Sequence, residues 1–268
     1  MAGKIPLWQL DAFADRPFGG NPAAVVCTDQ ALAPDLMQAI AAENNLAETA
    51  FLVPLADDGP GAYGLRWFTP EAEVDLCGHA TLASGAVVLT HLAPDCEEAR
   101  FETVSGLLRV RREGSDFSVD LPAEVPEPSP IPEPVAALFP GDDPTYLAAR
   151  KGVVVLPSAR AVRDYQPDFA ALSRLETDGL IITAPGDVAG IDFVSRYFAP
   201  HVGIPEDPVT GSAHCILVSY WAEKIGKSEL SALQVSARGG RLNCRKEGRR
   251  VHLSGGVRPY LEGFLLLD

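Results

Sequence analysis

An internal repeat constrains the fold of this chain more than any other feature of its sequence. The segment LRWFTPEAEVDLCGHATLASGAVVL, residues 65–89, and the segment VSRYFAPHVGIPEDPVTGSAHCILVSYW, residues 194–221, share one order. Each runs from an arginine through two aromatic residues, one further residue and a proline to a variable turn, a glycine and an apolar run. Self-similarity at a fixed separation is the signature of a duplicated structural unit.

The repeat continues downstream in SGLLRVRREGSDFSVDL and GGRLNCRKEGRRVHL. Gly106 aligns with Gly240 at a separation of 134 residues, close to the 130 residues that separate Arg66 from Arg196. Chance does not readily produce three matched blocks at nearly one separation. We therefore predict two copies of one α/β unit, in which the charged turns RREGSD and RKEGRR form ordinary hairpins without chemistry.

The two copies are joined by the most proline-rich part of the chain, LPAEVPEPSPIPEPVAALFP, residues 121–140. Its prolines are spaced so that neither a helix nor a central strand is expected, and the segment is predicted to be an extended linker. The predicted domains are residues 1–123 and 124–268, with the last residues able to pack back on the first domain. Both mix strand-like runs, such as AAVVC and GLIIT, with helical ones, such as APDLMQAIAAENN, so the class is α+β.

Composition excludes several classes of function. With 268 residues and 47% apolar content the chain can bury a large core, and it contains no apolar run long enough to cross a membrane. Its N-terminus lacks the layout of a secretory signal, and its five scattered cysteines suggest neither disulfides nor a zinc site. We therefore expect a cytoplasmic protein that does not bind a membrane. A formal charge of −14 would repel nucleic acid.

Each repeat places a glycine directly before the apolar run, Gly78 in the first and Gly211 in the second. The first backbone N–H groups of a helix have no internal partner and carry the positive end of the helix dipole, so they favour an anion. Two such helix starts facing each other across a cleft between the domains would hold one small carboxylic acid. A single pair such as Gly211–Ser212 more often ends a loop and caps a helix, and only the duplication makes a site worth considering.

Groups that can move protons accompany these turns. Cys77 and His79 flank Gly78, Asp207 precedes Gly211, and Glu48 stands between a helical segment and the apolar run TAFLV. Apolar neighbours disfavour the charged form of a carboxylate, which suits proton transfer near neutral pH. A lone glutamate is more often a solvated surface residue. Asn21, after Gly19 and Gly20, belongs either to a tight turn or to the cleft.

The motifs DAFADRPFGGNPAAVV, NNLAETAFL, RWFTPEAEVDLCGHATLAS and EDPVTGSAH together resemble the PhzF-like family of phenazine biosynthesis proteins, which belongs with the diaminopimelate epimerase fold. The resemblance runs from near Leu10 to the C-terminal GGVRPYLEG. It implies two pseudo-symmetric domains, each a curved mixed sheet wrapped around a central helix. The repeat found above agrees with this architecture independently.

The resemblance also implies an isomerase that needs no cofactor and no metal and acts on a small carboxylate-bearing metabolite. By motif, the catalytic residues fall on Glu48, His79 and Asp207. Asn21 and the helix starts at Gly78, Gly211 and Ser212 would bind the substrate. The resemblance further implies a homodimer.

Two alternatives remain open at this stage. Related epimerases use two cysteines, one at each helix start, and here Cys77 occupies the first position while the second helix start has none. A helix start can lower the pKa of a thiol, so a Cys77-assisted epimerase or racemase is the second hypothesis. Cys77 as a small buried residue is the simpler interpretation. A third hypothesis is a non-catalytic small-molecule binding protein on the same scaffold.

Overall fold

The computed structural model describes residues 3–141 and 144–267, and these form two compact units. The first unit contains the residues up to Leu121 and those from Leu253 onward, and the second runs from Pro122 to His252. The residues from Leu253 onward belong to the first unit because the C-terminal strand pairs with the first strand of the chain.

The first unit is one mixed sheet with two main helices. Its strands lie in the order β18–β1–β2–β3–β4–β6–β7–β8, with the short β5 also paired to β4. β2 and β3 run parallel, as do β4 and β6, and the other pairs are antiparallel. The elements are β1 Gly3–Ala12, β2 Asn21–Cys27, α1 Pro34–Asn44, β3 Glu48–Pro54, β4 Ala62–Phe68, β5 Glu73–Val74, α2 Gly78–Val87, β6 Glu98–Thr103, β7 Gly106–Glu113, β8 Asp116–Pro122 and β18 Val257–Leu267.

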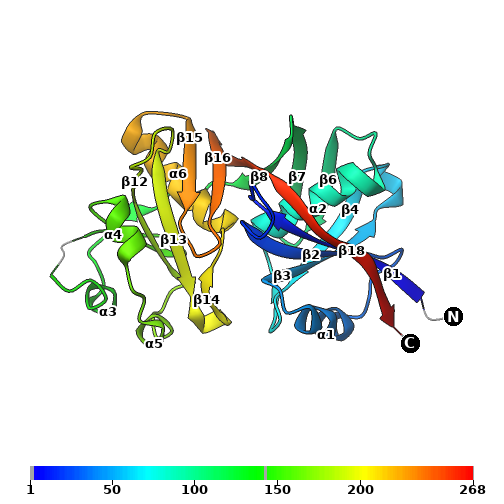
Figure 1. Cartoon of the computed structure of the whole chain (residues 1–268), viewed down its shortest axis with the longest axis horizontal. Helices are drawn as coiled ribbons and strands as arrows, with labels where there is room; N and C mark the ends of the chain where they lie inside the picture. Colours follow the sequence, from blue (N-terminus) through cyan, green and yellow to red (C-terminus); the bar gives the residue numbers. More distant parts are fainter. Residues whose placement is uncertain (1–2, 142–143, 268) are drawn as a thin grey trace. The chain divides into compact units, whose positions relative to one another are not determined.

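Helix α2 is the centre of the first unit, enclosed by its strands (Figure 1). All ten of its residues are buried, including the polar residues His79, Thr81 and Ser84. Gly85 allows the closest approach, because a Cβ at this position would lie 2.3 Å from the side chain of Val110 on β7. Helix α1 covers the opposite face of the sheet, where Met37 and Ile40 pack with Phe51 and Phe68.

The second unit repeats this topology. Its strands lie in the order β9–β10–β11–β12–β13–β15–β16, with β14 also paired to β13, and the parallel pairs are β11–β12 and β13–β15. The elements are β9 Glu127–Pro128, α3 Glu133–Ala136, β10 Thr145–Ala148, β11 Gly152–Val155, α4 Ala159–Asp164, α5 Phe169–Leu172, β12 Leu180–Pro185, β13 Phe193–Ala199, β14 Ile204–Asp207, α6 Gly211–Ile225, β15 Glu229–Gln234 and β16 Gly240–Glu247. The strand β17 Arg250–Gly255 begins in the second unit and ends in the first. The matched topologies establish the duplication that the sequence predicts.

The proline-rich segment is more than the extended linker that its composition predicts. It contributes β9, which pairs with β10, and the four-residue helix α3. Proline is compatible with both elements, because a sheet-edge strand and the first turn of a helix do not need every backbone N–H. Val135 and Phe139 from this segment are buried in the core of the second unit.

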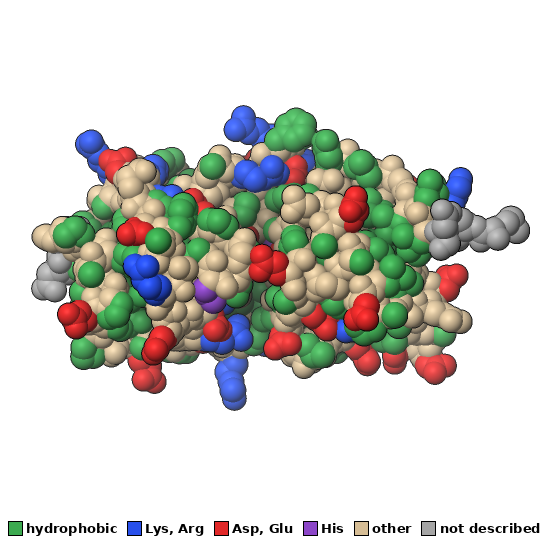
Figure 2. Space-filling view, turned by 90° about the horizontal axis from the view of Figure 1, so that it is seen from below, with side chains coloured by type: hydrophobic (Ala, Val, Ile, Leu, Met, Phe, Trp, Pro, Cys, Tyr) green, Lys and Arg blue, Asp and Glu red, His purple; other side chains and the backbone are tan. Residues whose placement is uncertain are grey.

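On the face shown in Figure 2 acidic side chains are scattered among basic and apolar ones, and no basic patch gathers there. Among the described residues no helix combines the length and the apolar character needed to span a membrane. All five cysteines are free.

Candidate active site

In the first unit three buried polar side chains form a chain of contacts at the start of α2. Nε2 of His79 lies 3.1 Å from Oε2 of Glu48, and Nδ1 of the same ring lies 3.1 Å from the side-chain nitrogen of Asn21. All three residues are buried. His79 is the second residue of α2, and Asn21 and Glu48 begin the neighbouring parallel strands β2 and β3. The structure thus brings together three residues that are far apart in the sequence.

Local backbone features place these side chains. Gly20, with a φ of 61°, turns the chain into β2, and a Cβ there would lie 2.2 Å from the carbonyl oxygen of Ala12. No other residue type fits this approach, so Asn21 enters the sheet at a defined position. On the other side, Asn45 ends α1 in the left-handed conformation, three residues before Glu48.

The electrostatics of this cluster bear on the Cys77 hypothesis. Burial raises the pKa of the Cys77 thiol to about 11, and the neighbouring Glu48 adds to this effect. The thiol is therefore protonated at neutral pH, contrary to the lowered pKa on which the Cys77 hypothesis depends. Burial lowers the pKa of His79, but the neighbouring Glu48 carboxylate acts in the opposite direction, and the pKa lies well above 6.5. An imidazole that holds its proton is a suitable hydrogen-bond donor to Glu48.

Cys77, His79 and Glu48 are also the residues that could hold a metal ion, since one ligand atom from each lies within 4.8 Å of the others. The ring of His79, however, contacts Glu48 through Nε2 and both Asn21 and Cys77 through Nδ1. A single ion uses one ring nitrogen and would break one side of this arrangement. The geometry is that of three polar side chains arranged around the ring of His79.

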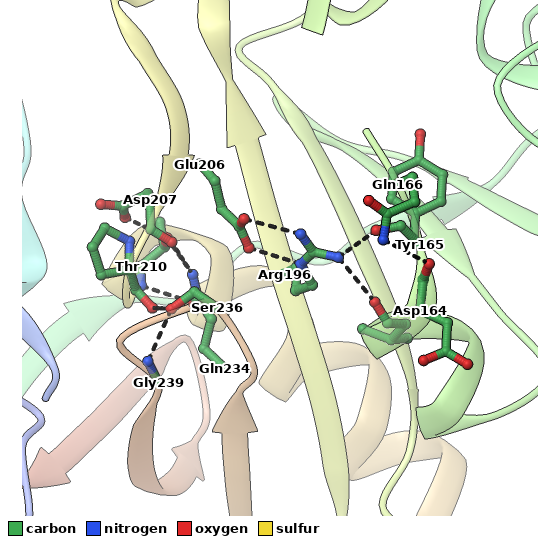
Figure 3. A network of polar contacts seen from close by, with 12 residues as sticks. Asp164, Tyr165, Gln166, Arg196, Glu206, Asp207, Thr210, Gln234, Ser236 and Gly239 are labelled. Carbon is green, nitrogen blue, oxygen red and sulfur yellow. Dashed lines mark hydrogen bonds and ion pairs between the residues drawn. The ribbon is translucent and has the colours of Figure 1, made fainter. Parts of the chain in front are cut away.

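In the second unit Asp207 lies at the end of β14, in the turn that leads into α6. The hydroxyl of Thr210 donates to its carboxylate, and Gln234 holds the turn from β15 (Figure 3). The Gln234 amide nitrogen donates to the backbone carbonyl of Asp207 at 2.7 Å, and its oxygen accepts from the Thr210 backbone N–H at 2.8 Å. Asp207, Thr210 and Gln234 are all buried, so the carboxylate is fixed by its surroundings.

Both central helices begin at the glycines that the repeat predicts. α2 begins at Gly78 after Cys77, and α6 begins at Gly211 after Thr210. Neither Cys77 nor Thr210 makes a capping hydrogen bond with its side chain, so these side chains do not occupy the first backbone N–H groups of the two helices. Ser212 lies inside α6 and does not occupy the capping position, which belongs to Thr210.

Several supporting residues were not identified from the sequence. The hydroxyl of Ser236 donates to the carbonyl of Pro208 at 2.7 Å, and the hydroxyl of Ser105 donates to the carbonyl of Asp75 at the same distance. In each unit a serine hydroxyl thus donates to a backbone carbonyl in the turn before the central helix. The signal in the sequence is the pair Val-Ser at 104–105 and at 235–236.

Comparison with known proteins places this site in a family. The model of the phenazine biosynthesis-like protein family matches residues 10–137 and 144–263. An uncharacterised isomerase of Pseudomonas aeruginosa is 47% identical over 98% of this chain and 100% of its own length. A crystal structure of a PhzF family protein from Enterococcus faecalis is 41% identical, with a TM-score of 0.92 over 99% of this chain and 100% of the other.

A more distant structure agrees in fold alone. A hydroxyproline epimerase from Agrobacterium vitis is 10% identical, with a TM-score of 0.64 over 100% of this chain and 94% of the other. The α+β architecture of two epimerase-like units is therefore shown by the structure and by its neighbours. With the family model spanning nearly the whole chain, this protein belongs to the phenazine biosynthesis-like, or PhzF, family.

Proposed function

We propose that this protein is a cofactor-independent isomerase that moves a proton within a small carboxylate-bearing metabolite, with Glu48 as the acid/base. The observation that carries the proposal is the buried chain Asn21–His79–Glu48 at the start of α2. The isomerase and epimerase names among its relatives support the reaction class.

In this mechanism Glu48 takes a proton from a carbon of the substrate and returns it at a different position or face, so that the product is an isomer. The ring of His79 donates to Glu48 and sets the direction of its free oxygen. Removal of the proton places negative charge on the substrate, and N–H groups at the start of α2 are suited to stabilise it. We assign Asp207 and the start of α6 to the same reaction. That the two helix starts share one substrate stays a prediction from the sequence.

The test is proton exchange with solvent. The protein is incubated in D₂O with a panel of small carboxylic acids, and loss of carbon-bound hydrogen is followed by ¹H NMR. We expect Glu48→Gln to abolish exchange in a protein that remains folded, as urea denaturation would show. Glu43→Gln, on the exposed face of α1, is the matched control and should exchange like the wild type.

The same assay separates the alternatives. A Cys77-assisted epimerase would lose exchange in Cys77→Ala and keep it in Glu48→Gln, and this result would overturn the assignment of Glu48. A binding protein without chemistry would show no exchange with any acid that raises its melting temperature. The raised pKa of Cys77 supports Glu48 over the thiol.

A further inference from the structure

A groove of about 410 Å³ lies on the first unit, between α1, the loop that precedes it and strands β3, β4 and β6. This volume is within the range of small-molecule sites. The groove is mostly apolar, and its floor and walls include Leu32, Met37, Phe51, Val53, Gly64 and Arg66.

The groove lies on the face of the sheet opposite to the candidate active site. Side chains alternate between the two faces of a strand, so on β3 Phe51 and Val53 share one face and Glu48 lies on the other. Phe51 belongs to the cluster beneath α1, and Glu48 contacts His79 of α2. A ligand in this groove would therefore not be the substrate that Glu48 acts on.

The second unit shows which side chains fill the position equivalent to this groove. Phe51 pairs with Arg66 in the first unit as Ile182 pairs with Arg196 in the second, so Val53 corresponds to Ala184 and Gly64 to Val194. In the second unit Ile182, Ala184 and Val194 are fully buried, in a core that α4 covers. In the first unit Val53 and Gly64 are partly exposed. Gly64 leaves open the space that Val194 fills in the other copy.

The two arginines share two kinds of contact. Each guanidinium lies over the phenylalanine two residues later, Arg66 at 5.2 Å from the ring centre and Arg196 at 5.0 Å. Each also binds one glutamate through Nε and Nη2.

The two arginines differ in the contacts of their third guanidinium nitrogen, Nη1. Nη1 of Arg196 donates to the backbone carbonyls of Tyr165 at 2.7 Å and Val162 at 3.3 Å, which come from α4 and the residue after it. Arg66 lines the groove, and its Nη1 has no protein acceptor among the residues that the structure describes. In the second unit the equivalent surface is thus covered by apolar side chains, and uncharged backbone carbonyl oxygens accept from the arginine.

We propose that this groove binds an uncharged small molecule whose apolar body covers Val53 and Gly64 and whose carbonyl oxygen accepts a hydrogen bond from Nη1 of Arg66. An anion is disfavoured, because Glu73 already neutralises Arg66 and Glu102 adds a second negative charge at the rim. The acceptors on Arg196, beside Glu206, are likewise neutral carbonyls.

The probes for the test are 4-phenylbutyramide and its anionic counterpart 4-phenylbutyrate. Met37 lines the groove and the only other methionine is Met1, so protein labelled with ¹³C in the methionine methyl groups reports contact directly. We expect the amide to shift the Met37 resonance in a saturable way and to bind at least tenfold more tightly than the carboxylate.

Gly64→Val is the decisive variant, because it installs the side chain found in the second unit. A Cβ at Gly64 would meet only the carbonyl oxygen of Val53, at 3.8 Å, so the position has room for it. We expect at least tenfold weaker amide binding, and Val188→Thr, an exposed position of the second unit, is the matched control. Unchanged binding in Gly64→Val, equal binding of both probes, or no shift of Met37 at millimolar amide would each overturn the proposal. Failure of the Glu48 exchange assay would leave it untouched.

Discussion

His214 shows how one buried residue can govern the response of the fold to acid. Its Nδ1 donates to the carbonyl of Thr210 at 2.7 Å, and its ring lies beside Phe193 in the core of the second unit. Burial lowers the pKa of His214 from 6.5 to about 4, against an opposing effect of the Thr210 carbonyl. The ring is therefore neutral in the folded protein at neutral pH, and it is a structural residue of α6.

This lowered pKa fixes the sign of a pH effect. Between pH 6.5 and about 4 the unfolded chain binds a proton on His214 and the folded protein does not, so acid favours unfolding. From pH 7 to pH 5 we expect this residue alone to remove about 2 kcal/mol from the free energy of unfolding, measured by urea denaturation. His214→Thr should lose this component, because Thr81 at the matching position of α2 makes the same contact to Cys77 without titrating. An equal loss of stability in both proteins would contradict the assignment.

At the scale of elements, the turn between β14 and α6 is organised by a side chain from another strand. Gln234 on β15 makes three hydrogen bonds, to the Asp207 carbonyl, the Thr210 N–H and the Thr210 hydroxyl (Figure 3). A buried N–H that loses its acceptor carries the full desolvation penalty. This strand end therefore decides where the Asp207 carboxylate is held.

We expect Gln234→Leu to reduce the free energy of unfolding by about 2–3 kcal/mol, because the buried N–H of Thr210 loses its acceptor while the volume is kept. Turnover of any identified substrate should fall as well, since the turn that carries Asp207 is released. Ser231→Ala, on the same strand with a partly exposed side chain, should change stability by less than about 0.5 kcal/mol. Urea denaturation of the three proteins measures the effect. A Gln234→Leu protein as stable as the wild type would show that the turn does not depend on this side chain.

The sequence predicted the elements that depend on local pattern. The helix over residues 33–45, the strand AAVVC and the helix starts at Gly78 and Gly211 are all present, because their glycines, prolines and apolar periods act within a few residues. The contacts of Gln234 could not be predicted in the same way, since its partners lie 24 to 27 residues earlier. Ser105 directly precedes Gly106, whereas three residues lie between Ser236 and Gly240. The two serines therefore do not align at the separation of 134 residues that relates the two glycines.

At the scale of the whole molecule, the two units are copies whose stabilising interactions have diverged. The ion pair Arg196–Glu206 is mostly buried, with side-chain exposures of 11% and 19%, whereas Arg66–Glu73 is exposed at 37% for both partners. Surface ion pairs contribute little, and removal of one partner of a buried pair is costly. Equivalent substitutions should thus have unequal effects in the two units.

Arg196→Met leaves Glu206 without its cation and removes the donor to the Val162 and Tyr165 carbonyls, so we expect a loss of about 3–5 kcal/mol from the second unit. Arg66→Met should cost the first unit less than about 1 kcal/mol. Hydrogen exchange followed by mass spectrometry resolves the units separately: protection of α4 and β14 should fall in Arg196→Met, while peptides from β4 and β5 keep their protection in Arg66→Met. Equal losses in both variants would mean that burial does not separate the two pairs. A selective loss would show that one copy of the motif depends on its arginine for stability and that the other does not.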